Sequence, residues 1–143
     1  MTQRFLNYMP LLFEFEGTVF ENDPDDPGGA TKYGIDQRSH PEVNIRSLTA
    51  DQAKKIYWDC YWNKNGIDAM PEKYGEVYFD LCVNSGAGRA KQLAAVSNTD
   101  PAQLLRARDL FYIRLAHNRP KSQKFLRGWL NRNNRLREYL KME

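Results

Sequence analysis

The amino-acid sequence predicts an all-α domain with one long loop after its first helix. Apolar residues recur at helical spacing through most of the 143 residues, and signals that begin and end helices separate these stretches. Residues 17–36 break the pattern, because they hold two prolines and four glycines and show no periodicity. A chain of this length commonly forms one domain. We therefore expect a single helical domain over residues 1–143.

The first helix is predicted to begin after Thr2, which can cap it, and to end at Gly17. Its apolar residues follow helical spacing: Phe5, Met9, Leu12, Phe13 and Phe15. Glu16 therefore falls in the last turn. Residues 17–36 follow as loop and turn with space for a short β-hairpin. Loops of this length inside a compact domain are usually functional.

Two helices with buried cysteines are predicted next. A capping box over residues 49–52 opens a helix that stops before Gly66. Another helix follows Pro71, and Gly86 closes it. Cys60 and Cys82 lie at apolar positions of these helices. Two cysteines make no disulfide framework, so we expect buried free thiols.

The C-terminal part of the chain is predicted to be entirely helical. A short alanine-rich helix covers about 88–96. Asp100 followed by Pro101 is an N-cap with proline at the first helical position, and this helix runs to about His117. The last helix covers about 121–140, with an apolar stripe of Phe125, Trp129, Leu136 and Leu140.

The net charge of +3 hides an asymmetry between the two halves of the chain. Residues 1–85 carry 8 Lys/Arg and 14 Asp/Glu, whereas residues 86–143 carry 13 Lys/Arg and 4 Asp/Glu. A basic half suggests an anionic partner such as a wall polymer or lipid headgroups, and the alternative is a solvated positive helix face. A nucleic-acid partner is not expected, since no recognition motif is present and the first half is acidic.

The residues best suited to catalysis lie between Glu16 and Asp26. Apolar neighbours disfavour the ionised form of a carboxyl group, and a general acid must carry its proton near neutral pH. Asp23, Asp25 and Asp26 follow on the loop, so a protonated glutamate could face an ionised aspartate, the pair that cleaves glycosidic bonds. The alternative from spacing alone is a lone glutamate followed by an acidic turn, with Asp23-Pro24-Asp25 as turn chemistry.

Residues 16–35 resemble glycoside hydrolase family 108, whose members are N-acetylmuramidases of phage endolysins and secretion-activator proteins. That family is marked by Glu-Gly-Gly-Tyr followed by Asp-Pro-x-Asp-Pro-Gly-Gly-x-Thr-x-x-Gly-Ile, and here Asp-Pro-Asp-Asp-Pro-Gly-Gly-Ala-Thr-Lys-Tyr-Gly-Ile stands over 23–35. Further similar segments lie, in the family's order, at 53–57, 61–62, 79–86 and 125–132.

The resemblance implies a lysozyme-like all-α fold that hydrolyses the bond from N-acetylmuramic acid to N-acetylglucosamine in bacterial peptidoglycan. Glu16 matches the family's catalytic glutamate. For the second carboxylate, Asp26 matches the family pattern, whereas Asp25 and Thr31 match the Glu–Asp–Thr spacing of phage-type lysozymes. The resemblance implies no metal or cofactor. Residues 1–85 would hold the catalytic helix and loop, and residues 86–143 a shortened peptidoglycan-binding-like region.

Three more residues are candidates for substrate binding. Asp80 and Asn84 are four residues apart and so share a helix face, where they could hydrogen-bond a sugar. The structural alternative is that Asp80 only ties down a loop. Tyr33 could stack on a sugar ring or pin the loop. Core packing is the expectation for Trp58 and Trp62.

Two further expectations concern activity and location. Thr18 stands in place of the motif's second glycine, which keeps open a catalytically inactive wall-binding or partner-binding protein on the same scaffold. The N-terminus lacks a convincing signal peptide, and no apolar run is long enough to span a membrane. We therefore expect synthesis in the cytoplasm and action in the periplasm or on the cell wall, after release by a holin-like or secretion route.

Overall fold

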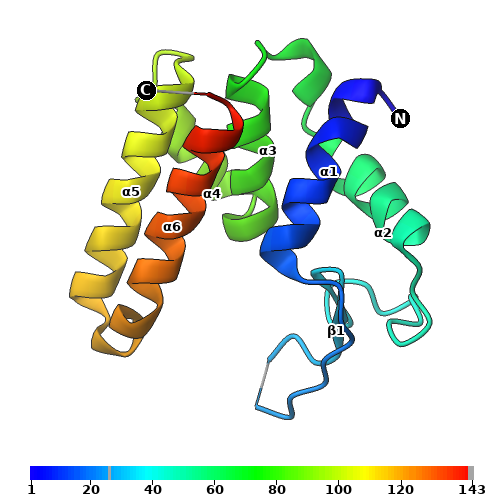
Figure 1. Cartoon of the computed structure of the whole chain (residues 1–143). Coiled ribbons are helices and arrows are strands. Elements are labelled where there is room, and N and C mark those ends of the chain that lie inside the picture. The colour runs from blue at the N-terminus through cyan, green and yellow to red at the C-terminus, as the bar shows by residue number, and fades with distance from the viewer. Residues whose placement is uncertain (26, 142–143) are drawn as a thin grey trace. The chain divides into compact units, whose positions relative to one another are not determined.

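The computed structural model describes residues 1–25 and 27–141 and is mostly helical, with one small antiparallel sheet (Figure 1). The predicted all-α class, with a short hairpin in the long loop, is confirmed. The chain divides into two compact units, Met1–Lys64 and Asn65–Glu143. The expectation of one domain stays a prediction. In the described residues, no helix combines the length and apolar character that a membrane crossing requires.

The first unit begins with α1 (Gln3–Glu16), whose ends match the sequence signals. The Thr2 hydroxyl accepts a hydrogen bond from the Phe5 N–H at 3.4 Å. At the other end, Gly17 has a φ of 81°, a conformation that glycine adopts without the penalty of a side chain. The helix therefore stops directly after Glu16.

The rest of the first unit consists of a hairpin and a second helix. Strands β1 (Thr31–Lys32) and β2 (Ile35–Asp36) pair antiparallel. Helix α2 (Ala50–Tyr57) starts at the predicted capping box, in which Thr49 and Gln52 exchange hydrogen bonds. It continues as a π-helical turn, η1 (Trp58–Trp62).

The π-helical turn corrects the expectation for Cys60. Both cysteines are free, as predicted, but Cys60 is exposed and only Cys82 is buried. A π-turn contains more residues than an α-turn, so the buried face passes from Tyr57 to Trp62 instead of to Cys60. The Trp62 ring packs edge-on against Phe5 at 5.3 Å between ring centroids, which confirms its core role.

The second unit contains the remaining helices, with boundaries close to those predicted (Figure 1). They are η2 (Ile67–Ala69), α3 (Tyr74–Ser85), α4 (Ala87–Ala94), α5 (Pro101–Asn118), η3 (Pro120–Ser122) and α6 (Gln123–Tyr139). Asp100 caps α5 by accepting from the Ala102 N–H at 3.1 Å. Helices α5 and α6 form a hairpin. Leu136 and Leu140 are buried as expected, whereas Phe125, at the exposed start of the stripe, is 51% exposed.

Candidate active site

Glu16 lies at the C-terminal end of α1 with its side chain partly exposed, and the turn of the hairpin contacts it. A Cβ atom added to Gly34 would lie 2.8 Å from the Glu16 Cβ and 2.9 Å from its Cγ. Only glycine therefore lets the hairpin approach the aliphatic part of Glu16 this closely. The contact limits where the carboxyl group can go.

The hairpin has the geometry that such an approach needs. Tyr33 and Gly34 have φ values of 54° and 78°, as the two central residues of a type I′ turn require. A tyrosine in this left-handed region costs on the order of 1 kcal/mol. Two contacts hold it there: the Tyr57 hydroxyl donates to the Tyr33 carbonyl at 2.8 Å, and the Tyr33 ring packs against Phe13 at 5.1 Å between centroids. Tyr33 thus pins the loop, and a sugar contact for its ring stays a prediction.

Thr31 is held on the same hairpin and is partly exposed. Its N–H donates to the Glu21 carbonyl and its carbonyl accepts from the Glu21 N–H, both at 2.8 Å. This bridge brings the start of the loop back beside β1. The predicted role of Thr31 in catalysis or binding is compatible with its place on the hairpin and stays a prediction.

The acidic part of the loop forms a turn, as predicted. The Asp25 N–H donates to the Asp23 carboxylate at 2.9 Å, and both side chains are exposed. The Asp25 side chain therefore lies in solvent. Asp26 lies outside the described residues, and the choice between Asp25 and Asp26 stays a prediction.

Asp80, a predicted sugar contact, is fully buried among arginines of the second unit. Its carboxylate accepts from Arg108 at 2.7 Å and from Arg132 at 2.9 and 3.0 Å. Burial alone would raise the pKa of this carboxyl, but the charges and hydrogen bonds of Arg132 and Arg108 outweigh it and hold the pKa well below its usual range. Asp80 thus joins α3 to α5 and α6, and direct contact with a sugar stays an untested prediction.

Asn84 lies one helical turn after Asp80, with an exposed side chain. Its Oδ1 accepts from the Tyr112 hydroxyl, from Arg108 Nη2 at 3.2 Å and from the Ser85 hydroxyl at 3.4 Å. Arg108 therefore connects the buried carboxylate of Asp80 to the exposed amide of Asn84.

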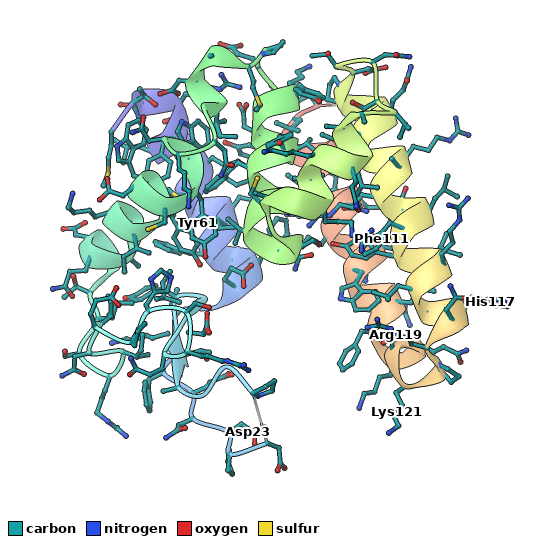
Figure 2. The ribbon with its side chains drawn as sticks, turned by 180° about the vertical axis from the view of Figure 1, so that it is seen from behind. Asp23, Tyr61, Phe111, His117, Arg119 and Lys121 are labelled. Carbon is teal, nitrogen blue, oxygen red and sulfur yellow. The ribbon has the colours of Figure 1, made fainter. Side chains whose placement is uncertain are left out.

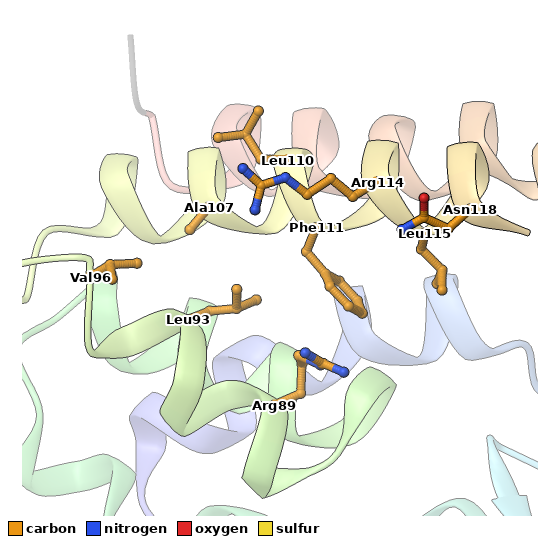
Figure 3. Close-up of a pocket in the computed structure, with 9 residues that line it drawn as sticks. All are labelled: Arg89, Leu93, Val96, Ala107, Leu110, Phe111, Arg114, Leu115 and Asn118. Carbon is orange, nitrogen blue, oxygen red and sulfur yellow. The ribbon is translucent and has the colours of Figure 1, made fainter.

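Asn84 borders a pocket of about 300 Å³ in the second unit, formed by α3, α4, α5 and α6. A second pocket of about 480 Å³ lies beside it between α4 and α5 (Figure 3). Its lining is mainly apolar, and it shares Arg89, Phe111 and Leu115 with the first.

Sequence reasoning missed the roles of Arg108 and Tyr112, and for Gly34 it identified the motif position but not the contact with Glu16. The hairpin contact of Gly34 depends on the tertiary approach of the loop to α1, which no local pattern encodes. Arg108 had a signal: it falls four residues after Leu104 on the apolar face of a helix, where an arginine needs a buried acidic partner. Within the described residues, no cluster of three or more His, Cys, Asp or Glu could hold a metal ion.

Comparison with known proteins places this chain among the glycoside hydrolases. The family model described as Glycosyl hydrolase 108 matches residues 9–86, more than half of the chain, and the chain belongs to this family. The solved structure of SagA from Brucella abortus is similar over 95% of this chain and 92% of that chain, with 26% sequence identity and a TM-score of 0.74. No curated protein sequence matches the chain.

Proposed function

We propose that this protein is a lysozyme-type N-acetylmuramidase, which hydrolyses the bond from N-acetylmuramic acid to N-acetylglucosamine in bacterial peptidoglycan. Membership of the Glycosyl hydrolase 108 family supports the class of reaction. The observation that carries the proposal is the setting of Glu16, which lies inside the matched segment at the end of α1, against the turn of the hairpin.

In the proposed reaction, Glu16 donates its proton to the glycosidic oxygen as the bond to the sugar breaks. An aspartate of the loop, Asp26 or Asp25, stabilises the oxocarbenium-like transition state or positions the attacking water. Water supplies the hydroxyl group of the new reducing end, and its remaining proton returns to the carboxyl pair. The chemistry needs only these groups and water.

The biological setting is part of the same proposal. Hydrolysis of the wall would serve phage-type host lysis or secretion, after release from the cytoplasm by a holin-like or secretion route. The alternative is an inactive wall-binding or partner-binding protein. The reason to consider it is that Thr18 departs from the family motif. Thr18 directly follows Gly17, the C-cap of α1, and its side chain is exposed to solvent.

Digestion of purified peptidoglycan distinguishes a muramidase from an inactive wall-binding protein. Sacculi are digested with the protein, the new ends are reduced with borohydride, and the fragments are analysed by mass spectrometry. A muramidase creates reduced N-acetylmuramic acid ends. Reduced N-acetylglucosamine ends would show that the other glycosidic bond is cut. Binding to sacculi without any fragments would support the inactive alternative and overturn the proposal.

A further inference from the structure

The pocket beside Asn84 presents hydrogen-bond donors and aromatic rings. Its donors are the side chains of Asn84, Arg89 and Arg119, and Phe111 and Trp129 are among its rings. In the part of the chain that the structure describes, no Asp or Glu lines this pocket. A pocket that offers donors and positive charge without a negative group is suited to an anionic acceptor.

The amide of Asn84 is held in one orientation. Three donors converge on its Oδ1, namely Arg108, Tyr112 and Ser85. Because the oxygen is occupied, the Nδ2 group faces away from them as a donor, and no described residue accepts from it. Arg108 is itself fixed by the buried carboxylate of Asp80 at 2.7 Å. The donor is therefore positioned before any ligand arrives, which reduces the entropy cost of binding.

Two arginines add positive charge to the same pocket. Arg119 directly follows α5 and is exposed (Figure 2). No ion pair joins it to a carboxylate of the described residues. Arg89 packs over the Phe111 ring, with 4.4 Å from its Cζ to the centroid (Figure 3). Its Nη1 donates to Gln92 at 2.8 Å. Its remaining guanidinium donors are available. A planar guanidinium matches the two oxygens of a carboxylate.

The apolar part of the lining restricts the ligand further. The rings of Trp129 and Tyr112 stack at 5.1 Å between centroids with 25° between their planes, and Leu115 lies beside them in the lining. Such a surface accommodates a methyl group next to a carboxylate. The peptide stems of bacterial wall glycans combine these features, since they are short, carry free carboxylates and contain alanine.

We propose that this pocket binds a carboxylate of the peptide stem attached to the wall glycan, with Arg119, Arg89 and Asn84 as its donors. The inference rests on the proposed function, which supplies the glycan. It assigns the second unit a part in substrate choice: the enzyme prefers glycan that carries peptide over glycan from which an amidase has removed it.

The first test compares cleavage of glycan strands with and without peptide stems. We expect wild-type kcat/KM to be about tenfold higher on the peptide-bearing strands, the worth of one charged hydrogen bond. Arg119→Gln should remove this preference and leave kcat/KM on the bare strands unchanged. Arg127→Gln, an exposed arginine on α6 outside this pocket, is the matched control and should keep it. Equal cleavage of both strands by the wild type, or an equal loss on both strands in Arg119→Gln, would overturn the proposal.

A binding measurement makes the result independent of catalysis. A soluble stem tetrapeptide and the same peptide with every carboxylate amidated are titrated into the protein and followed by calorimetry. We expect the free acid to bind at least tenfold tighter than the amide, and Asn84→Asp or Arg119→Gln to abolish the difference. If glycan is not cleaved but this binding occurs, the proposed function fails and the pocket assignment stands. Glycerol phosphate is titrated as an anion that is not a peptide. Equal affinity for acid and amide, or tighter binding of glycerol phosphate than of the peptide, would contradict the assignment.

Discussion

Glu16 owes its setting to residues from three separate segments. Gly17 ends α1 directly after it, Gly34 admits the hairpin, and Tyr57 holds the hairpin turn through the Tyr33 carbonyl. Gly17, Tyr33 and Gly34 all have a positive φ. The position of Glu16 at the helix end could be predicted from the sequence, because a capping glycine follows it. The approach of Gly34 could not, since it depends on where the folded loop lies.

Replacing Gly34 by alanine should disturb Glu16 sterically. The added Cβ would overlap the Tyr57 hydroxyl and lie 2.8 Å from the Glu16 Cβ. Gly66→Ala is the matched control, because Gly66 also has a positive φ, 66°, and nothing lies within 4 Å of its added Cβ. Urea unfolding should show a loss of about 1 kcal/mol for the control, from backbone strain. For Gly34→Ala we expect about 1–3 kcal/mol more, from overpacking, together with slower clearing of sacculi. Equal losses in the two variants would contradict the close contact.

The second carboxylate is tested by replacing Asp25 and Asp26 separately with asparagine. We expect Asp26→Asn to be the more damaging change to sacculus hydrolysis, because Asp26 matches the family pattern before Pro27. A larger loss for Asp25→Asn, with both melting temperatures unchanged, would reverse the assignment.

At the scale of elements, helix boundaries were predictable because local side chains encode them. Thr2, Thr49 and Asp100 each accept a hydrogen bond from the first turn of the helix that they cap. The π-helical turn over 58–62 was not predictable, since its residues fit an ordinary α-helix equally well. It changes which residues are buried and so exposes Cys60. Burial raises the pKa of the other thiol, Cys82, to about 12.

The ion pairs of Asp80 should be essential to the packing of α3 on α5 and α6. Asp80→Asn leaves the Arg108 charge buried without its carboxylate, and removing one partner of such a pair costs about 3–5 kcal/mol. Asp59→Asn, which breaks the exposed i,i+4 pair with Lys55, should cost about 0.5 kcal/mol or less. Urea unfolding at pH 7 measures both, and a cost below 1 kcal/mol for Asp80→Asn would contradict this role.

The same residue makes part of the stability depend on pH. The pKa of Asp80 is lowered by folding, so its contribution is present above the pKa of an unfolded aspartate, about 4. The contribution is lost as the pH falls below that value toward the folded pKa. Wild type should therefore lose more free energy of unfolding between pH 5 and pH 3 than Asp80→Asn does. An identical loss in both proteins would show that Asp80 is not the group responsible.

At the scale of the whole molecule, the basic second half should govern how the enzyme reaches its substrate. Lys121, Lys124 and Lys141 are exposed. Anionic wall polymers or membrane surfaces would attract such charges over about a Debye length, near 8 Å at physiological ionic strength. We expect hydrolysis of intact walls to fall with added salt, while cleavage of a short neutral muropeptide barely changes. Replacing the three lysines by glutamate should reproduce the salt effect without changing the reducing-end product. If added salt does not change the hydrolysis of intact walls, the prediction is wrong and the basic surface is only a solvated helix face.

The all-α fold was predictable from helical periodicity, and the class of enzyme from the Asp-Pro-Asp-Asp-Pro-Gly-Gly loop. Much of the site was not predictable, because it consists of contacts between residues far apart in sequence. Asp80 illustrates this difference. Its spacing from Asn84 indicated a shared helix face correctly, but only the folded chain shows Arg108 and Arg132 on its carboxylate.

The central claim is that Glu16 is the acid that breaks the glycosidic bond, and the Glu16→Gln variant tests it most directly. Glutamine keeps the shape of the side chain at the end of α1 but has no acidic proton to donate. Turnover of purified sacculi should fall by roughly 10²- to 10⁴-fold, with the melting temperature and the circular dichroism spectrum unchanged. Glu14→Gln, an exposed glutamate on the same helix, should keep wild-type turnover. Wild-type turnover by a folded Glu16→Gln protein would contradict the mechanism.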